Sequence, residues 1–225
     1  MSVCSHLPMP SPTDAPGLII FDCDGVLVDS ELLSCQSLAD VLALSGIDLD
    51  VAQALDLFLG RSTQAVLQHY RDLGRALPET FLTDLKQNVR TRFAASLQPI
   101  PGIAAVLAEL KLPCCVASSS DLDRVTYSLA MTGLAGYFDD RLYTAEMVAR
   151  GKPAPDLFLH AAAKMGVAPA RSLVIEDSVS GVTAAKAAGM RVWGFVGGSH
   201  YQGRDGRAIL RDAGADRVFE RMQDF

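Results

Sequence analysis

Short apolar segments alternate with helical patterns along most of the chain, and this alternation limits the possible folds more than any other feature. The apolar segments are residues 17–22, 113–118, 172–177 and 191–196, with weaker ones at 141–145 and 216–219. The helical patterns between them are residues 102–110, 121–133, 155–166 and 179–189. Strands that alternate with helices predict an α/β fold, and continuously apolar strands indicate a parallel sheet covered on both faces.

Residues 32–98 break this alternation, because they contain helical patterns and no convincing strand. Four such patterns, each bounded by Gly, Pro or Asp, lie at 32–47, 51–60, 63–74 and 78–97. We therefore predict a doubly wound, Rossmann-like core of residues 17–31 and 99–225 with an inserted helical cap subdomain at 32–98. An insertion at the carboxyl end of a strand lies over the ligand crevice of such a sheet, where a lid would lie.

Composition and charge exclude several classes of protein. The 225 residues are 49% apolar and carry a net charge of −6, which argues against non-specific nucleic-acid binding. No apolar run approaches the roughly 18 residues of a membrane span. Residues 1–16 contain four prolines and no apolar core of a signal peptide, so we expect a flexible tail.

The cysteines indicate a reducing compartment. There are five of them, with no CxxC pair, which does not suit a disulfide framework or a zinc site. We expect buried, reduced thiols in a cytoplasmic protein. No feature of the sequence points to a protein partner.

Polar side chains cluster where the predicted strands end. Ligands of an open parallel sheet bind beyond the carboxyl ends of its strands, so these residues are expected to share one edge. They are Asp22 and Asp24 at the end of the first strand, Ser118 and Ser119 at the end of the second, Lys152 in the turn before the helix at 155, and Glu176 and Asp177 at the end of the strand at 172–177.

The chemistry of this set indicates a metal and an anion. Buried carboxylates repel one another and cost several kcal/mol unless a cation joins them. Carboxylate oxygens without His or Cys suit Mg²⁺. Ser118, the backbone amides that follow it and Lys152 can donate hydrogen bonds to a phosphate group.

Other interpretations of the acidic stretch fail at particular positions. An EF-hand loop counted from Asp22 would have Val26 and Leu27 where an oxygen ligand and a glycine are needed. The chain contains no GxxxxGK[ST] loop and no GxSxG turn.

Four segments resemble the motifs of the haloacid dehalogenase-like hydrolase superfamily. FDCDGVLVDS (21–30) is similar to the first motif, DxDGx[LV]xDS, and VASSS (116–120) to the second. GKPAPD (151–156) resembles the third, and VIEDSVSGVTAAKAAGM (174–190) the fourth. They occur in order over residues 17–196. The early helical insertion is similar to the cap of the branch that contains β-phosphoglucomutase, phosphoglycolate phosphatase and many sugar-phosphate phosphatases.

The resemblance implies a role for each matching residue. Asp22 would be the nucleophile that forms an aspartyl-phosphate, and Asp24 would protonate the leaving oxygen and then activate water. Mg²⁺ would be held by the Asp22 carboxylate, the Asp24 backbone carbonyl and Asp177, with Glu176 close by. Ser118, Ser119 and Lys152 would bind the phosphate group and the substrate.

Residues outside the four motifs receive weaker assignments. Arg61, in the cap segment LGRST, either reads the substrate or is a solvated residue at a helix start. Asp29 and Ser30 are expected to support the loop or cap the next helix. The four histidines, which are His6, His69, His160 and His200, are expected to be surface or core residues.

These residues favour a phosphatase over the other activities of the superfamily. The second acid, Asp24, argues against a true dehalogenase, whose motif lacks it. β-Phosphoglucomutase resembles the chain but carries a His where this chain has Ser34. We therefore expect a Mg²⁺-dependent phosphatase that hydrolyses a small phosphate monoester, such as a sugar phosphate. A phosphosugar mutase and a non-catalytic phosphate-binding regulatory protein are the alternatives.

Overall fold

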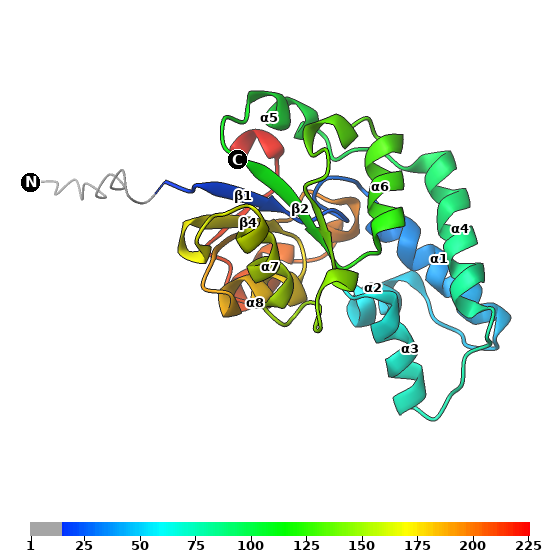
Figure 1. Cartoon of the computed structure of the whole chain (residues 1–225). Helices are drawn as coiled ribbons and strands as arrows, with labels where there is room; N and C mark the ends of the chain where they lie inside the picture. Colours follow the sequence, from blue (N-terminus) through cyan, green and yellow to red (C-terminus); the bar gives the residue numbers. More distant parts are fainter. Residues whose placement is uncertain (1–14) are drawn as a thin grey trace, which may run out of the picture.

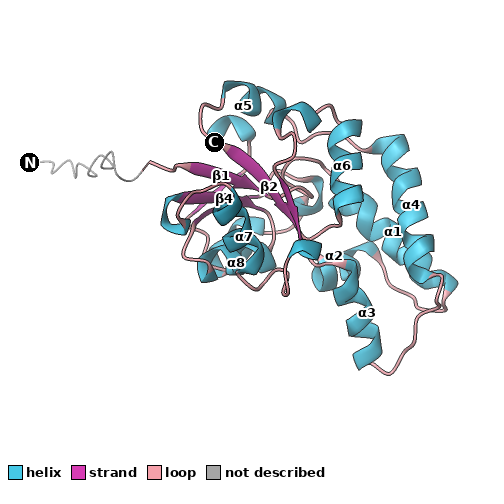
Figure 2. Cartoon of the chain, viewed as in Figure 1, coloured by secondary structure: helices cyan, strands magenta, loops and turns pink. Residues whose placement is uncertain are grey.

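A six-stranded parallel sheet forms the core of the protein, in the strand order β3-β2-β1-β4-β5-β6 (Figures 1 and 2). The computed structural model describes residues 15–225, so all but the last two residues of the expected tail lie outside the described residues. The strands are β1 (Leu18–Phe21), β2 (Cys114–Ser118), β3 (Leu142–Thr144), β4 (Ser172–Glu176), β5 (Arg191–Phe195) and β6 (Arg217–Phe219).

Helices cover both faces of this sheet, which confirms the predicted fold class. They are α5 (Ile103–Glu109), α6 (Leu122–Met131), α7 (Asp156–Lys164), α8 (Val179–Ala187) and α9 (Gly206–Asp212), and short 3₁₀ turns occur at 135–137, 145–147, 169–171, 199–201 and 222–224. Ile19 and Phe21 of β1 pack in the core cluster that includes α5 and α6. Leu18 and Ile20 pack in the cluster that includes α7, α8 and α9. Alternate residues of a strand point to opposite faces, so both faces of β1 must be apolar.

The strand order places two acidic strand ends side by side. The chain leaves β1 toward β2 and β3, then returns to the other side of β1 for β4, β5 and β6. Strand order therefore reverses between β1 and β4, which pair with Phe21 beside Ile175. A crevice forms where the order of a doubly wound sheet reverses, and ligands bind there.

Four helices occupy the segment between β1 and α5, as the sequence patterns predicted. They are α1 (Glu31–Leu44), α2 (Val51–Phe58), α3 (Thr63–Asp72) and α4 (Phe81–Ser96). Their largest apolar cluster is separate from the two clusters of the sheet and includes Leu42, Phe58 and Phe81. Figure 1 shows these helices beyond the ends toward which the strand arrows point.

The two connections to the helical insertion run side by side. Val28 and Pro99 form an isolated antiparallel bridge. On either side of it, Asp29 N donates to Gln98 O over 2.9 Å and Ile100 N donates to Leu27 O over 2.9 Å. The helical segment therefore leaves and re-enters the core at one place, next to the loop that carries Asp24.

The sequence patterns did not predict α9. This helix has seven residues, GRAILRD, and buries Gly206 and Leu210. Its apolar residues Ala208, Ile209 and Leu210 are consecutive rather than spaced three or four apart, so no helical periodicity identifies it. Its Asp205 N-cap accepts a hydrogen bond from Ala208 N at 3.1 Å, a local signal that does not depend on periodicity.

Replacing Phe138 tests how much the packing of the core against β1 stabilises the protein. Its side chain is fully buried and meets the Phe21 ring edge-on, with 6.2 Å between the ring centroids. We expect Phe138→Ala to lower the free energy of unfolding by about 3–5 kcal/mol, because it leaves a cavity behind β1. Leu44→Ala truncates a side chain that is 82% exposed, so the free energy of unfolding should change by less than about 0.5 kcal/mol. Equal losses for both variants in urea unfolding would contradict this account of the core.

Candidate active site at the carboxyl end of the sheet

The ammonium group of Lys152 lies at the centre of the strand-end cluster. Its Nζ donates to Asp22 Oδ1 at 2.5 Å, to Glu176 Oε1 at 2.8 Å and to the Ala117 carbonyl at 2.8 Å. The three contacts join the ends of β1, β4 and β2. The Lys152 side chain is buried, which by itself lowers its pKa, but the two carboxylates outweigh burial and raise that pKa above its usual value. Lys152 is therefore charged at neutral pH.

The neighbouring acids carry more negative charge than Lys152 can balance. Burial raises the pKa of Asp22 well above its usual value, and Glu176, Asp177 and Asp24 add to the effect while Lys152 opposes it. Burial and Glu176 likewise raise the pKa of Asp177. A further cation placed among these groups would favour their ionised forms.

Asp177 is the acid with the fewest partners. Within the described part of the chain, neither of its carboxylate oxygens accepts a hydrogen bond, although the residue is 1% exposed. His200 Nε2 lies 3.1 Å from Asp177 Oδ2, but the two groups are not oriented for a hydrogen bond. Burial also lowers the pKa of His200, so the imidazole is neutral and does not compensate the charge. A buried acceptor without a donor indicates a place for a bound cation.

The oxygens around Asp177 fit a hard divalent cation such as Mg²⁺. Residues 15–225 contain no group of three His, Cys, Asp or Glu side chains arranged to hold a metal. The carboxylates of Asp22 and Asp177 and the backbone carbonyl of Asp24 could supply three ligands, and Mg²⁺ commonly keeps water in its other positions. Gly25 has φ +78, and a Cβ there would lie 1.8 Å from Asp177 Oδ2, so only glycine lets the loop approach this acid.

Asp24 lies in a different environment from Asp22. Its Oδ1 accepts from Ser30 Oγ at 2.6 Å and from Arg124 Nη2 at 2.6 Å, and its Oδ2 accepts from Ser120 Oγ at 2.7 Å. Burial alone would raise the pKa of Asp24, but Arg124 and the two hydroxyl groups outweigh it and lower that pKa. Two acids separated by a single residue therefore have opposite pKa shifts, a pattern typical of sites in which two carboxyl groups have different roles.

Ser118 and Ser119, at the carboxyl end of β2, have different contacts. Ser118 is 1% exposed, and its Oγ accepts a hydrogen bond from Ser120 N at 3.0 Å. The N-cap of α6 is Asp121, which accepts from Arg124 N at 2.8 Å, so Ser118 does not cap that helix. Ser119 Oγ donates to Gly60 O at 3.2 Å and thus joins the core to the loop between α2 and α3.

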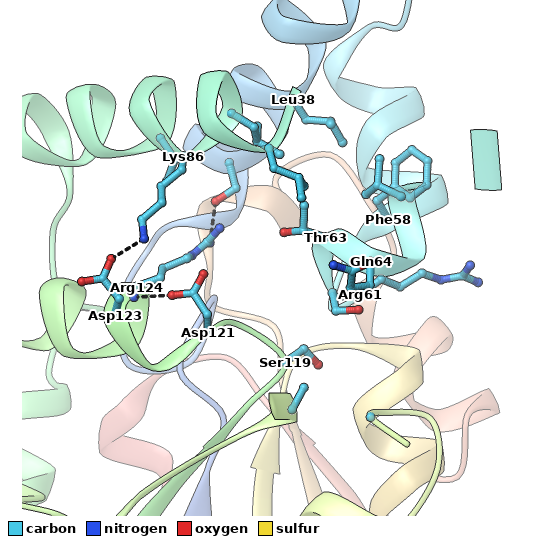
Figure 3. Close-up of a pocket in the computed structure, with 18 of the residues that line it drawn as sticks. Leu38, Phe58, Arg61, Thr63, Gln64, Lys86, Ser119, Asp121, Asp123 and Arg124 are labelled. Carbon is cyan, nitrogen blue, oxygen red and sulfur yellow. Dashed lines mark hydrogen bonds and ion pairs between the residues drawn. The ribbon is translucent and has the colours of Figure 1, made fainter. Parts of the chain in front are cut away.

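A cavity of about 520 Å³ separates the helical insertion from the core (Figure 3). The insertion lines it with apolar side chains, including Leu38, Phe58 and Phe93, and with polar ones, including Arg61, Lys86 and Arg90. The core side contributes the polar residues Ser119, Asp121, Arg124 and Glu146, together with Tyr127 and Val148. Asp22, Glu176 and Asp177 do not line this cavity; its floor lies beside the turn at Gly151, next to Lys152.

Arg61 borders this cavity, but Figure 3 shows its guanidinium group pointing away from Ser119 and Asp121. The residue is exposed, at the start of α3. Of the two interpretations of Arg61, this conformation matches the solvated residue. Asp29 supports a loop, as expected, because its Oδ1 accepts from Ser199 N at 3.0 Å and from Ser199 Oγ at 2.8 Å.

Arg124 and His200 are site residues that the sequence analysis did not identify. His200 is buried, one of the two expected locations, but it also lies against Asp177. It follows the carboxyl end of β5, so the strand-end argument would have found it if applied to that strand. For Arg124, the only signal in the sequence is its position in the first turn of the helix that follows β2. His69 and His160 pack against aromatic rings, and His6 lies outside the described residues.

Comparisons with known proteins agree with this geometry. The family model of the haloacid dehalogenase-like hydrolases matches residues 16–189. The 6-phosphogluconate phosphatase of Escherichia coli (strain K12) is 30% identical over 187 residues, which are 81% of this chain and 83% of that protein. The fructose-1-phosphate phosphatase of the same strain is 34% identical over 175 residues, 76% of this chain and 92% of that protein.

A solved structure extends the similarity to the whole fold. A conserved haloacid dehalogenase-like protein from Agrobacterium tumefaciens strain C58 is 39% identical, with a TM-score of 0.78, and the match covers 93% of this chain and 96% of that one. The fold and the strand-end acids define a hydrolase with a Rossmann-like core and an inserted helical segment. The chain belongs to the haloacid dehalogenase-like hydrolase family. In the described residues, no helix is long and apolar enough to cross a membrane.

Replacing Gly181 tests whether the close packing of α8 against Glu176 stabilises the site. A Cβ at this position would lie 1.7 Å from Glu176 Oε1, the atom that accepts from Lys152. We expect Gly181→Ala to displace Glu176 and to lower the free energy of unfolding by about 1–3 kcal/mol, as overpacking does. Gly136→Ala is the matched control, because no atom lies within 4 Å of the added carbon. If Gly181→Ala unfolds in urea like the control, the contact does not support the site.

Proposed function

We propose that the protein is a Mg²⁺-dependent phosphatase that hydrolyses a small phosphate monoester, a sugar phosphate or a related metabolite. One observation carries this proposal: a buried lysine salt-bridged to Asp22 lies beside Asp177, whose two oxygens have no hydrogen-bond partner among the described residues. Such a site can neutralise a phosphate group from two sides. The sugar-phosphate names of the two bacterial relatives support the substrate class.

Mg²⁺ would be held by the Asp22 and Asp177 carboxylates and the Asp24 backbone carbonyl, with Glu176 nearby. When bound, the metal would neutralise phosphate charge and orient the ester. Glu176 would act mainly through Lys152, because its Oε1 accepts from the lysine and its Oε2 accepts from Ser178 N at 2.7 Å and from Ser178 Oγ at 2.9 Å. Ser118, Ser119 and Lys152 would bind the phosphate oxygens.

Asp22 would act as the nucleophile. Its carboxylate oxygen would form a bond to phosphorus while the bond from phosphorus to the ester oxygen breaks, giving an aspartyl-phosphate and an alcohol. An ionised Asp22 needs no separate base. Lys152 would stay bonded to the attacking carboxylate and would reduce the charge that gathers on the phosphoryl oxygens.

Asp24 would handle the protons of both half-reactions. The contacts of Asp24 lower its pKa in the absence of substrate, so the negative charge of the bound phosphate would have to raise that pKa and favour the protonated form. In the first half Asp24 would then give this proton to the leaving oxygen, and in the second half it would regain one from the water that attacks phosphorus. That second attack breaks the bond between Asp22 and phosphorus and releases inorganic phosphate. The contacts of Asp24 with Ser30, Ser120 and Arg124 would keep it near the reacting atoms in both halves.

The cavity supports a small organic leaving group. A volume of about 520 Å³ is within the range of small-molecule sites. Ser119, Asp121 and Arg124 on its core side would face the phosphate and the sugar hydroxyls, while the apolar side chains of the cap, such as Phe58 and Phe93, would exclude water. We infer that the helical insertion 32–98 acts as the cap, and that the enzyme works in the cytoplasm, where its four described buried thiols would remain reduced.

A mutase activity has less support in the structure. Where β-phosphoglucomutase carries its His, this chain has Ser34, whose Oγ donates to Ser30 O at 2.7 Å and accepts from Arg124. A serine at this place cannot exchange protons near neutral pH as an imidazole can. With β-glucose 1-phosphate and a trace of the bisphosphate, we expect free glucose and phosphate rather than glucose 6-phosphate.

The nucleophile assignment is tested with p-nitrophenyl phosphate and Mg²⁺. We expect wild type to release nitrophenolate, and Asp22→Asn to lose at least about 10³-fold in kcat, because the amide cannot attack phosphorus. Asp29→Asn is a control with the same chemical change at an acid that supports a loop. Equal turnover by wild type and Asp22→Asn would remove Asp22 from the mechanism. Phosphate binding without turnover by wild type would favour a regulatory protein.

Adding Mg²⁺ tests, independently of catalysis, whether a cation binds the buried acids of the site. We expect millimolar Mg²⁺ to raise the melting temperature of wild type, because the cation binds the folded acids and not the unfolded chain. Asp177→Asn should abolish this rise, since it removes a charged ligand. Without Mg²⁺, the same variant should melt at or above the wild-type temperature, because one repelling charge is gone. A rise with Mg²⁺ of the same size in both proteins would place the metal elsewhere.

A further inference from the structure

Arg124 links the acid of the first motif to the helical insertion. It lies in the first turn of α6, a helix of the core. Its Nη2 donates to Asp24 Oδ1 at 2.6 Å and to Ser34 Oγ on α1 at 2.8 Å. Its guanidinium carbon also lies 5.1 Å from the centroid of the Phe93 ring on α4. One side chain thus contacts Asp24 and both terminal helices of the insertion.

The contacts of Asp24 leave its carboxylate little freedom. Ser30 and Arg124 hold Oδ1, and Ser120 holds Oδ2. Among these donors, Arg124 is the charged one, and charge-assisted hydrogen bonds are about twice as strong as neutral ones. Without the guanidinium, two hydroxyl groups on separate loops would remain to orient the carboxylate.

The other cations that border the cavity are placed differently. Lys86 Nζ and Arg90 Nη1 both pair with Asp123 Oδ2, at 2.8 Å and 3.0 Å. The Arg61 guanidinium points away from the cavity, as Figure 3 shows. Figure 3 also shows the Arg124 side chain reaching under the cavity toward the α1 hydroxyl that it contacts. Its Nε is buried without a hydrogen-bond partner in the described structure, so this arginine retains an unused donor at the cavity floor.

We propose that Arg124 is a positioning residue for Asp24: it holds the carboxyl group where it meets the leaving oxygen of the substrate. The proposal rests on the proposed phosphatase function. It assigns no covalent step to Arg124. The expected consequence is selective, because only esters with a poor leaving group depend on a well-placed proton donor.

Two phosphate esters of similar size separate this role from a general structural one. Nitrophenolate leaves phosphorus readily without a proton, whereas the alkoxide of benzyl phosphate needs one. The ratio kcat/KM covers the steps up to departure of the leaving group, so the later hydrolysis of the aspartyl-phosphate does not enter the comparison.

Arg124 favours the ionised form of Asp24, so removing it favours the proton donor, and a loss on benzyl phosphate can come only from lost orientation. For Arg124→Ala, we expect kcat/KM to fall about 10- to 100-fold for benzyl phosphate and less than about 3-fold for p-nitrophenyl phosphate. Arg124→Lys, which keeps a charge but cannot bridge Asp24 and Ser34 in the same way, should show a smaller selective loss. Ser34→Ala, which removes the second anchor of the guanidinium, should change the same ratio in the same direction. These two variants keep the test valid if Arg124→Ala does not fold.

Arg92→Ala is the matched control, because Arg92 also connects helices, through Asp40 on α1, but does not line the cavity. Its two kcat/KM values should keep the wild-type ratio. Equal losses on both esters in the Arg124 and Ser34 variants, or no loss on benzyl phosphate, would overturn the positioning role. If wild type hydrolyses neither ester, the proposed function fails instead, and the two failures are distinguishable.

Discussion

The ion pairs of Lys152 with Asp22 and Glu176 are the interaction on which the rest of the site depends. They join the loop before α7 to the neighbouring ends of β1 and β4 and offset the repulsion between the two carboxylates there. Removing one partner of a buried ion pair typically costs about 3–5 kcal/mol, because the other charge remains buried. The lysine still leaves Asp177 without a donor among the described residues. This residual negative charge is the physical reason to expect a metal cation.

The site also depends on contacts between the core and the helical insertion. Gly60 O, in the loop between α2 and α3, accepts hydrogen bonds from Ser119 Oγ and from Ser180 Oγ at 3.0 Å. A Cβ at Gly60 would lie 2.4 Å from the Ser178 side chain, so the close approach requires glycine. On the opposite side, Arg124 contacts α1 and α4. The two sets of contacts join the helical insertion to the core on both sides of the cavity.

Much of this arrangement could be predicted from the sequence, for identifiable reasons. Strands buried on both faces are continuously apolar, so the strands at 17–22 and 172–177 were visible as patterns. Parallel strands end at one edge, so Asp22, Asp24, Glu176 and Asp177 could be expected near each other. The helix α9 was missed because its three apolar residues, 208–210, are consecutive and show no helical periodicity. Arg124 was missed because its meaning comes from its contact with Asp24, 100 residues earlier in the chain.

The sequence by itself determined the class of fold, the place of the helical insertion and the set of acids and donors at the strand ends, because each depends on local periodicity or on the geometry common to parallel sheets. Only the tertiary structure decided how those groups share their charges. It placed Lys152 between Asp22 and Glu176, gave Asp24 an arginine and left Asp177 beside a neutral His200. These relations depend on distances of a few ångströms between segments far apart in the chain, and side-chain electrostatics at that range follows packing rather than sequence pattern.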